Sequence, residues 1–143
     1  MAEKYEVEGF KELNKALKIF PENVERRILR SMAQAGGQVV VKAARENVPV
    51  KTGKLKKGII RRSKKGPKTA GRVEVSVGPS QDVFYGMFLE FGTSKIPATP
   101  WLRPALDENR DAIIEAMRQR GLKRIEKEAE KAAQQAGVKK LKK

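Results

Sequence analysis

The sequence predicts an α+β fold with long N-terminal helices, a small antiparallel sheet of three to four strands and a C-terminal helix. Apolar residues recur at three- and four-residue steps before residue 47 and after residue 104, and valines alternate with polar residues between these stretches. The length of 143 residues is typical of one domain. We expect a single α+β domain over residues 1–121 and a charged helical extension with a basic tail over residues 122–143.

Two helices are predicted in the first third of the chain. A short one is indicated by apolar residues at steps of three, four and three, namely Phe10, Leu13, Leu17 and Phe20. Pro21 interrupts it, and proline is favoured at the first position of a new helix. A helix over about 21–47 is indicated by a second apolar series, Val24, Ile28, Met32, Ala35, Val39 and Ala43. Gly36 and Gly37 in its middle predict a kink, a close approach of another backbone, or a tolerated weak spot.

Two strands are predicted in the middle of the chain. Pro49 ends the long helix, and residues 52–53 indicate a turn before a strand over about 55–62. Residues 64–71 contain glycine, proline and charge but no apolar anchor, which predicts an exposed hairpin loop. A second strand, closed by residues 78–79, is indicated by valines that alternate with polar residues, namely Val73, Val75 and Val77.

A third strand and a proline-rich arm are predicted next. Residues 85–91 carry apolar side chains on both faces, which predicts a strand that is covered on both sides or lies at a subunit contact. Residues 92–93 end it, and three prolines between 94 and 104 predict an extended arm. A helix is expected to run from about 104 into the 130s, with Gly121 as a weak point.

Positive charge is concentrated in one segment. The chain carries a net charge of +15, and residues 48–72 hold ten basic side chains and no acidic one. Such a segment faces either the phosphates of a polyanion or an acidic protein. No aromatic residue lies within it and no helix-turn-helix, zinc or RNP pattern occurs, so any nucleic-acid contact is expected to be sequence-independent. The candidate polyanion-facing residues are Lys51, Lys54, Lys56, Lys57, Arg61, Arg62, Lys64, Lys65 and Lys68.

The composition argues against an enzyme. The chain has no histidine and no cysteine, which removes the commonest metal ligands and the side chain best suited to proton transfer near neutral pH. Asp82 and Glu90 lie too far apart along a strand to form an acid–base pair, and no phosphate-binding glycine pattern occurs. We predict no catalytic residue, no cofactor and no metal site. With no export signal and no apolar stretch near the roughly 18 residues that span a bilayer, no membrane contact is expected.

Glu90 is the most unusual charge in the sequence. It lies among Phe88, Leu89 and Phe91, where a carboxylate is costly unless a cation is near. We consider two alternatives. In one, Arg103 or a basic residue of a neighbouring subunit pairs with Glu90, and in the other Glu90 faces water on an edge strand.

Three blocks of sequence, in order, carry a resemblance to a known family. The first, P-V-x-T-G-x-L, has Pro49, Thr52, Gly53 and Leu55. The second, E-F-G-T, has Glu90, Phe91, Gly92 and Thr93. The third, P-x-L-R-P-A, has Pro100, Trp101, Leu102, Arg103 and Pro104 and ends at Ala105. Together they resemble the tail-completion, or head-tail joining, proteins of long-tailed bacteriophages. Lys51 stands where the family usually has an acidic residue, so this loop is more basic than the pattern.

The resemblance implies a structural virion protein without catalytic activity. Proteins of this kind assemble into a six-fold ring at the neck, complete the tail and join it to the DNA-filled head, leaving a channel for DNA. The implied partners are copies of the same chain, a head-side connector or stopper protein, and a tail terminator or tail tube protein, with non-specific DNA contact in the channel. The implied location is the tail or neck of the virion, and the host cytoplasm during assembly.

Two alternatives remain open at the level of the sequence. The chain is either such a ring subunit, with the residues of the three blocks at the subunit interface, or a small basic protein that binds nucleic acid without sequence preference. Trp101 either anchors the proline-rich arm on a neighbouring subunit or folds onto the core of its own subunit.

Overall fold

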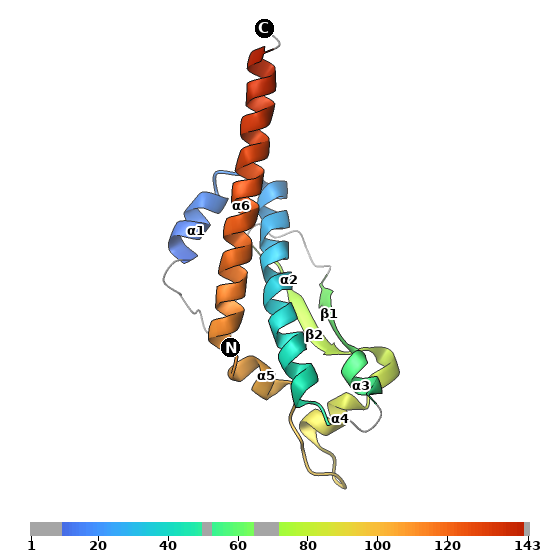
Figure 1. The fold of residues 1–143 in the computed structure, drawn as a ribbon. Helices are drawn as coiled ribbons and strands as arrows, with labels where there is room; N and C mark the ends of the chain where they lie inside the picture. The colour runs from blue at the N-terminus through green and yellow to red at the C-terminus, as the bar shows by residue number, and fades with distance from the viewer. Residues whose placement is uncertain (1–9, 50–52, 65–71, 142–143) are drawn as a thin grey trace.

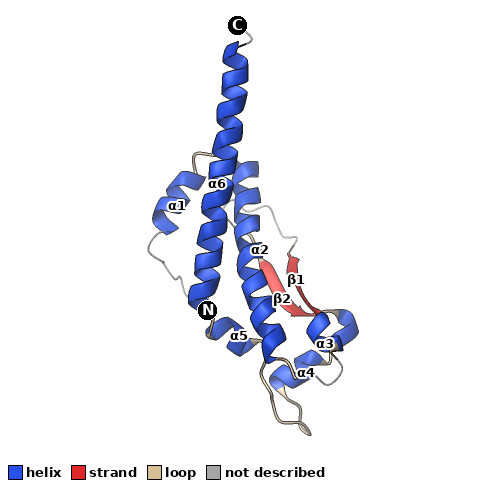
Figure 2. Cartoon of the chain, viewed as in Figure 1, coloured by secondary structure: helices blue, strands red, loops and turns tan. Residues whose placement is uncertain are grey.

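The structure of the chain, a computed structural model, describes residues 10–49, 53–64 and 72–141. Two long helices, α2 (Glu22–Asn47) and α6 (Arg110–Leu141), pack side by side. A small hairpin lies against α2 on one side, and α1 (Phe10–Leu17) packs on α6 on the other side (Figure 1). Figure 2 shows how little of the fold is strand. The predicted α+β class, with helices before the sheet and a helix after it, is confirmed.

Helices α1 and α2 form where the apolar spacing predicts them. Leu13 and Leu17 of α1 are buried, as are Ile28 and Met32 of α2, so each helix turns one apolar face inward. Pro21 immediately precedes α2, and its carbonyl accepts the first hydrogen bonds of the helix. Both predicted helices are confirmed.

The glycines of the long helices mark close contacts. A Cβ on Gly36 would lie 2.9 Å from Met117 Cγ of α6, and a Cβ on Gly37 would lie 3.1 Å from Val75 Cγ1 of the hairpin. The neighbours that approach this pair are side chains, not another backbone as one of the three alternatives expected. Gly121, predicted as a weak point, is buried against Met32, and α6 continues through it.

The sheet is smaller than predicted. It consists, among the described residues, of β1 (Ile59–Ser63) and β2 (Val75–Pro79), which pair antiparallel from Ile59 opposite Pro79 to Ser63 opposite Val75. The prediction of three to four strands was therefore wrong in number, whereas the strand of alternating valines is confirmed from Val75 onward. The predicted hairpin loop lies, apart from Lys64, outside the described residues.

The strand predicted over about 55–62 begins later than expected. Residues Lys54–Lys57 form a single helical turn, α3, which buries Leu55, and β1 follows at Ile59. Gly53 precedes the turn with φ of 71°, a conformation that favours glycine, and its carbonyl accepts a hydrogen bond from Lys57 N. A glycine thus lies on each side of α3, and Gly58 separates this turn from the strand.

The strand predicted over 85–91 is a helix. A one-turn 3₁₀ helix (Gln81–Val83) leads into α4 (Gly86–Phe91). The alternation of apolar residues suited a strand, but a short apolar run does not distinguish the two structures by its periodicity. Here the helical spacing decides, because it buries Gly86 and Glu90 together and leaves Phe84, Phe88 and Phe91 outside.

The C-terminal helix is confirmed but is preceded by a separate short one. Helix α5 (Arg103–Asp107) ends at residues 108–109, where Asn109 Nδ2 donates to the Ala105 carbonyl, and α6 begins at Arg110. The predicted single helix from about 104 is therefore two helices. The C-terminal part of α6 extends past the end of α2 (Figure 1).

The core has two parts. Around Trp101, side chains from α2, α3, β1 and the segments near α4 and α5 pack together. At the other end, Leu13 and Leu17 of α1 pack with Ile28 and Met32 of α2, with Met117 and Ile125 of α6 beside them. The first part positions the candidate site.

Candidate assembly interface

Glu90 on α4 is the centre of a buried hydrogen-bond cluster. Its side chain is 1% exposed. Backbone N–H groups of three consecutive residues donate to its carboxylate, from Trp101 at 2.6 Å, Leu102 at 2.8 Å and Arg103 at 2.9 Å. Arg103 Nε donates to the same carboxylate at 3.1 Å. We call this arrangement the Glu90 clamp, because it fixes the proline-rich arm to α4.

The clamp satisfies a charge that would otherwise be costly to bury. Burial of the Glu90 carboxyl raises its pKa, but the hydrogen bonds from the backbone of Leu102, Arg103 and Trp101 and from the Arg103 side chain outweigh burial, so the pKa lies below its ordinary value. The expectation that Arg103 pairs with Glu90 is confirmed, and the alternative that Glu90 faces water was wrong. The backbone donors were not predicted, because their position depends on how the arm folds back.

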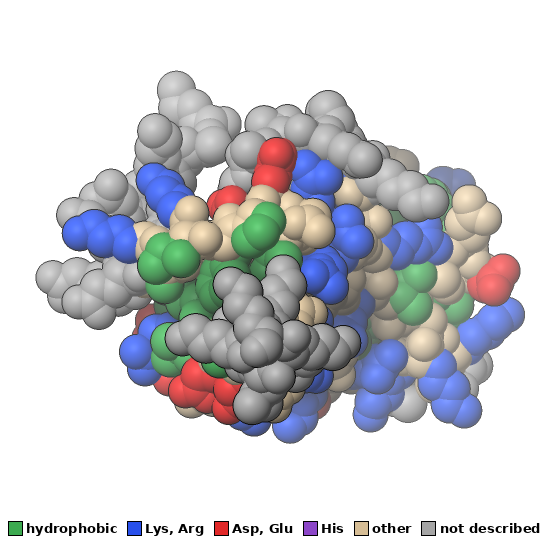
Figure 3. All heavy atoms as spheres, turned by 90° about the horizontal axis from the view of Figure 1, so that it is seen from above, with side chains coloured by type: hydrophobic (Ala, Val, Ile, Leu, Met, Phe, Trp, Pro, Cys, Tyr) green, Lys and Arg blue, Asp and Glu red, His purple; other side chains and the backbone are tan. Residues whose placement is uncertain are grey.

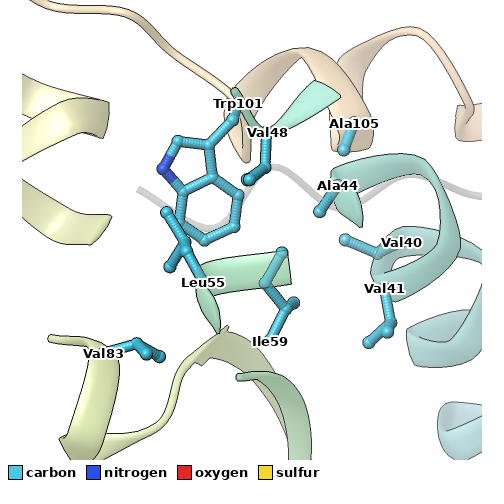
Figure 4. Close-up of a cluster of buried hydrophobic side chains, with 9 residues drawn as sticks. All are labelled: Val40, Val41, Ala44, Val48, Leu55, Ile59, Val83, Trp101 and Ala105. Carbon is cyan, nitrogen blue, oxygen red and sulfur yellow. The ribbon is translucent and has the colours of Figure 1, made fainter. Parts of the chain in front are cut away.

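Trp101 anchors the arm within its own subunit. The indole is fully buried, and its Nε1 donates to the Gly86 carbonyl at 2.9 Å. Figure 4 shows the indole beside Leu55 and Val48 in the core. A Cβ on Gly86 would lie 2.6 Å from Leu55 and 3.3 Å from the indole, so the ring packs directly on the α4 backbone. Of the two alternatives for Trp101, packing on its own core is the one observed.

The second block ends in a turn that aims the arm back at α4. Gly92 has φ of 75°, and a Cβ there would lie 2.8 Å from Ala98 N. Thr93 Oγ1 accepts from Ile96 N at 3.0 Å, and Thr93 N donates to the Ile96 carbonyl at 2.8 Å. Thr99 N then donates to the Leu89 carbonyl at 2.7 Å. The glycine and the threonine are thus the residues that the turn requires.

The structure brings most of the three blocks together. Leu55 of the first block packs beside Gly86 and in the same core cluster as Trp101 of the third block. The second and third blocks meet at this place. Pro49 and Pro100 are exposed, Leu102 and Pro104 are half-buried, and Thr52 lies outside the described residues, as does Lys51. The blocks therefore share one structural role, which is to fix the arm and α4 to the end of α2.

The outer face of α4 is aromatic and exposed. Phe84, Phe88 and Phe91 are spaced by four and three residues on one side of a helical segment and are 58%, 51% and 62% exposed. The Phe84 and Phe88 rings meet edge to face at 6.0 Å, and the Arg103 guanidinium lies 5.5 Å from the Phe91 ring centroid. We call these three residues the aromatic face. Clustered exposed aromatic residues are typical of protein–protein contacts.

Sequence reasoning named Phe91 but not Phe84 or Phe88 as interface residues. The available signal was that both faces of residues 85–91 are apolar, from which a subunit contact was one of two expectations. A helical plot of the same residues separates an inner face with Gly86 and Glu90 from the aromatic face. The clamp and the aromatic face are therefore two sides of one short helix.

The candidate polyanion-facing residues that the structure describes lie in or beside α3 and β1. Lys54, Lys56, Lys57, Arg61, Arg62 and Lys64 are all exposed, whereas Lys51, Lys65 and Lys68 lie outside the described residues. Arg61 is held by the Gln34 carbonyl at 2.7 Å, and Lys64 lies 3.6 Å from Glu74. On the face seen in Figure 3, lysine and arginine side chains are scattered among other side chains rather than gathered in a single stripe.

Within the described ranges, no three metal-ligating side chains come together. No helix among these residues is long and apolar enough to cross a membrane.

One comparison with known proteins identifies the family. A family model described as "Bacteriophage HK97-gp10, putative tail-component" matches residues 11–92, which is more than half of the chain. The chain belongs to the HK97-gp10-like family of phage tail components. The match includes the first block and most of the second, and it supports the phage resemblance that the three blocks indicated. No curated protein and no solved structure matches the chain.

Membership in this family describes the protein at a coarse level. It is a structural tail protein of a bacteriophage and a component of the virion.

Proposed function

We propose that this tail component is a ring subunit at the phage neck, which completes the tail and joins it to the DNA-filled head around the DNA channel. The observation that carries the proposal is the aromatic face. Three exposed phenylalanines lie on α4 and just before it, and the opposite side of α4 is fixed by the buried Glu90 clamp. A contact surface that is rigid before docking loses little conformational freedom when a partner binds.

The proposed assembly is a six-fold ring of identical subunits. Its neighbours are a head-side connector or stopper protein and a tail terminator or tail tube protein. Closing such a ring requires heterologous contacts, in which one surface of each copy meets a different surface of the next. The aromatic face supplies an apolar surface for one of these protein contacts, and no catalytic step is part of the function.

We also propose that the chain divides into a folded domain over residues 1–121 and a charged extension over residues 122–143. Ile125 of α6 packs against the core cluster of Leu13, Leu17, Ile28 and Met32. Residues 126–135 of the same helix are mostly exposed. An exposed helix of this length projects from the domain and is available to a neighbouring subunit or partner. We propose that the part of the extension beyond Ile125 adds to the assembly and not to the folded core.

Charge substitutions on the aromatic face test the neck function. Tails assembled with Phe88→Asp and Phe91→Asp protein are mixed with filled heads, and infectious particles are counted. We expect a loss of about a hundredfold or more, because a carboxylate cannot be buried unpaired in an apolar contact. Electron microscopy of the same mixtures should show separate heads and tails.

Ile19→Asp is the matched control. Ile19 is 83% exposed and lies in the turn after α1, away from α4. Infectivity with this control should equal that of the unchanged protein. Normal head-tail joining with the Phe88 and Phe91 variants, provided that they fold, would refute the proposed role of the aromatic face.

A second candidate function is sequence-independent DNA contact within the channel. It is favoured by the exposed side chains of Lys56, Lys57 and Arg62 beside a chain-wide charge of +15. If these residues neutralise phosphates, the logarithm of the DNA affinity should fall linearly with the logarithm of salt concentration. Replacing all three by glutamine should then reduce the magnitude of that slope by about three, which is about one for each lost phosphate contact. An unchanged slope would exclude these residues from DNA contact.

A further inference from the structure

An open apolar groove of about 430 Å³ lies between β2 and α6, with α2 between them. Gly36 brings α6 close to α2, and Gly37 does the same for β2. Both glycines are buried, because side chains of Met117 and Val75 pack directly against them. The other lining side chains are largely aliphatic and include Val75, Val77, Leu106, Ile113 and Met117.

The unpaired edge of β2 faces this groove. Lys64 N donates to the Glu74 carbonyl at 2.9 Å and Ser80 N to the Gly58 carbonyl at 2.8 Å, so even-numbered residues of β2 direct their peptide groups toward β1. The peptide groups of Val75 and Val77 therefore point the other way. Val75 and Val77 line the groove, whereas no residue of β1 does. Among the described residues, no third strand pairs with β2.

The geometry suits one additional strand. A two-stranded sheet is marginal on its own, and an exposed strand edge is a template for pairing with another chain. A strand beside β2 would bond to the peptide groups of Val75 and Val77. Every second side chain of that strand would enter the groove between β2 and α6, and the others would face solvent.

The first nine residues of the chain have the pattern that this site requires. They lie outside the described residues and read Met-Ala-Glu-Lys-Tyr-Glu-Val-Glu-Gly. Tyr5 and Val7 alternate with Glu6 and Glu8, which is the period of a strand with one apolar and one acidic face. The segment holds three acidic residues and one lysine in a chain of net charge +15.

The charges around the groove complement this segment. Val75, Val77 and Arg61 are the side chains of the sheet that approach α2 at Gly37, so Arg62 lies on the opposite face. Glu6 and Glu8 of an added strand would lie on the same face as Arg62. Arg103 lines the groove and pairs with Glu90. Tyr5 and Val7 would supply the apolar side chains.

We propose that residues 3–8 of one copy add a third strand to β2 of the next copy. The segment precedes α1, which packs on α6 on the side of the molecule away from the hairpin (Figure 1). The acceptor edge and the helix that follows the donor segment therefore lie on different sides of one subunit, as in a head-to-tail contact. The inference rests on the proposed ring and names one contact that closes it.

Disulfide trapping tests the contact, since the chain has no cysteine of its own. Two single-cysteine proteins, Val7→Cys and Leu106→Cys, are mixed and oxidised, and the cross-linked heterodimer is quantified on non-reducing gels. Leu106 lines the groove and is 50% exposed. We expect about tenfold more heterodimer than from Val7→Cys mixed with Lys131→Cys, because docking raises the local thiol concentration. Lys131 is exposed on the outer part of α6.

Two results would overturn the inference. One is an equal yield from the test pair and the control pair. The other is a Val7→Cys/Leu106→Cys double variant that forms its disulfide within a monomer, since the segment would then complete its own sheet. Val75→Pro should lower the heterodimer yield severalfold, because it removes an outward N–H and leaves the bonds to β1 in place.

The same variants separate this inference from the proposed neck function. If the test pair cross-links and Val7→Lys abolishes joining of heads to tails, both stand. If Val7→Lys particles join normally and the test pair does not cross-link, the strand contact is wrong and the neck function stands. If tails lacking the whole protein join heads normally, the neck function is wrong whatever the trapping result.

Discussion

The segment from α4 to α5 and the outer part of α6 differ in what holds them in place. The first is irregular, with a short helix, a tight turn and an arm with three prolines, yet a buried carboxylate and a buried indole fix it to the core. The second is regular helix, but residues 126–135 in it are mostly exposed. Regular backbone and tertiary stabilisation are therefore separate properties in this protein.

The comparison also separates two kinds of surface. The aromatic face is exposed on a segment that the rest of the fold holds rigid. The extension is exposed on a helix that only its own backbone hydrogen bonds support, and isolated helices are marginal in water. Substitutions should therefore have large effects on stability in the first region and small effects in the second.

The largest expected effect comes from the indole. Trp101→Ala should lower the free energy of unfolding by about 3–5 kcal/mol, because it leaves a cavity and removes a hydrogen bond to Gly86. Urea unfolding followed by circular dichroism measures it, since the substitution removes the only tryptophan. Phe91→Ala is the control, because this ring is 62% exposed. Equal losses in the two variants would contradict the core placement of Trp101.

The clamp should come next. Glu90→Gln should cost about 2–3 kcal/mol, because an amide cannot accept all the hydrogen bonds that the carboxylate accepts. Arg103→Gln should cost about 1 kcal/mol, since the three backbone donors remain. Urea unfolding of both variants gives the two values. A larger loss for Arg103→Gln would show that the side-chain ion pair, and not the backbone, holds the carboxylate.

The clamp should also make stability depend on pH. Because the pKa of Glu90 is lowered in the folded protein, its contribution is complete above the ordinary glutamate pKa and is lost as the pH falls through the folded value. The difference in unfolding free energy between the unchanged protein and Glu90→Gln should therefore shrink as the pH is lowered through this range. A difference that stays constant down to the lowest pH at which both fold would refute the linkage.

The smallest effect should come from the extension. Removing residues 131–143 should change the free energy of unfolding by less than about 0.5 kcal/mol, because the described side chains removed are exposed. Urea unfolding of the shortened chain tests this, with Ile125→Ala as a comparison that does reach the second core. A loss as large as that from Glu90→Gln would mean that the extension is part of the folded unit.

Local pattern was sufficient for the elements with a long repeat. Helix α2 and the valine strand follow from spacing alone, because many residues repeat the same period. Six residues of α4 contain too little repeat to separate helix from strand, and the interpretation as a strand was wrong. The break between α5 and α6 was likewise not predicted, since no proline or glycine marks residues 108–109.

For the candidate site, a physical cost predicted more than a pattern did. The cost of burying an unpaired carboxylate led to the expectation of a cation near Glu90, and Arg103 is there. The same reasoning does not reveal that three backbone N–H groups donate hydrogen bonds to the carboxylate. Nor does it reveal that Trp101 is buried in its own core. Both depend on where the arm lies after it turns at Gly92.

The sequence by itself determined the fold class, the long helices, the valine strand and the phage family, and it left the partner of Glu90 open. Only the tertiary structure decided that α4 is a helix with an inner clamp and an outer aromatic face, and that β2 has a free edge beside a groove. The reason is the range of the interactions. Periodicity records contacts between near neighbours, whereas the Glu90 clamp and the groove join residues that meet only after the chain has folded.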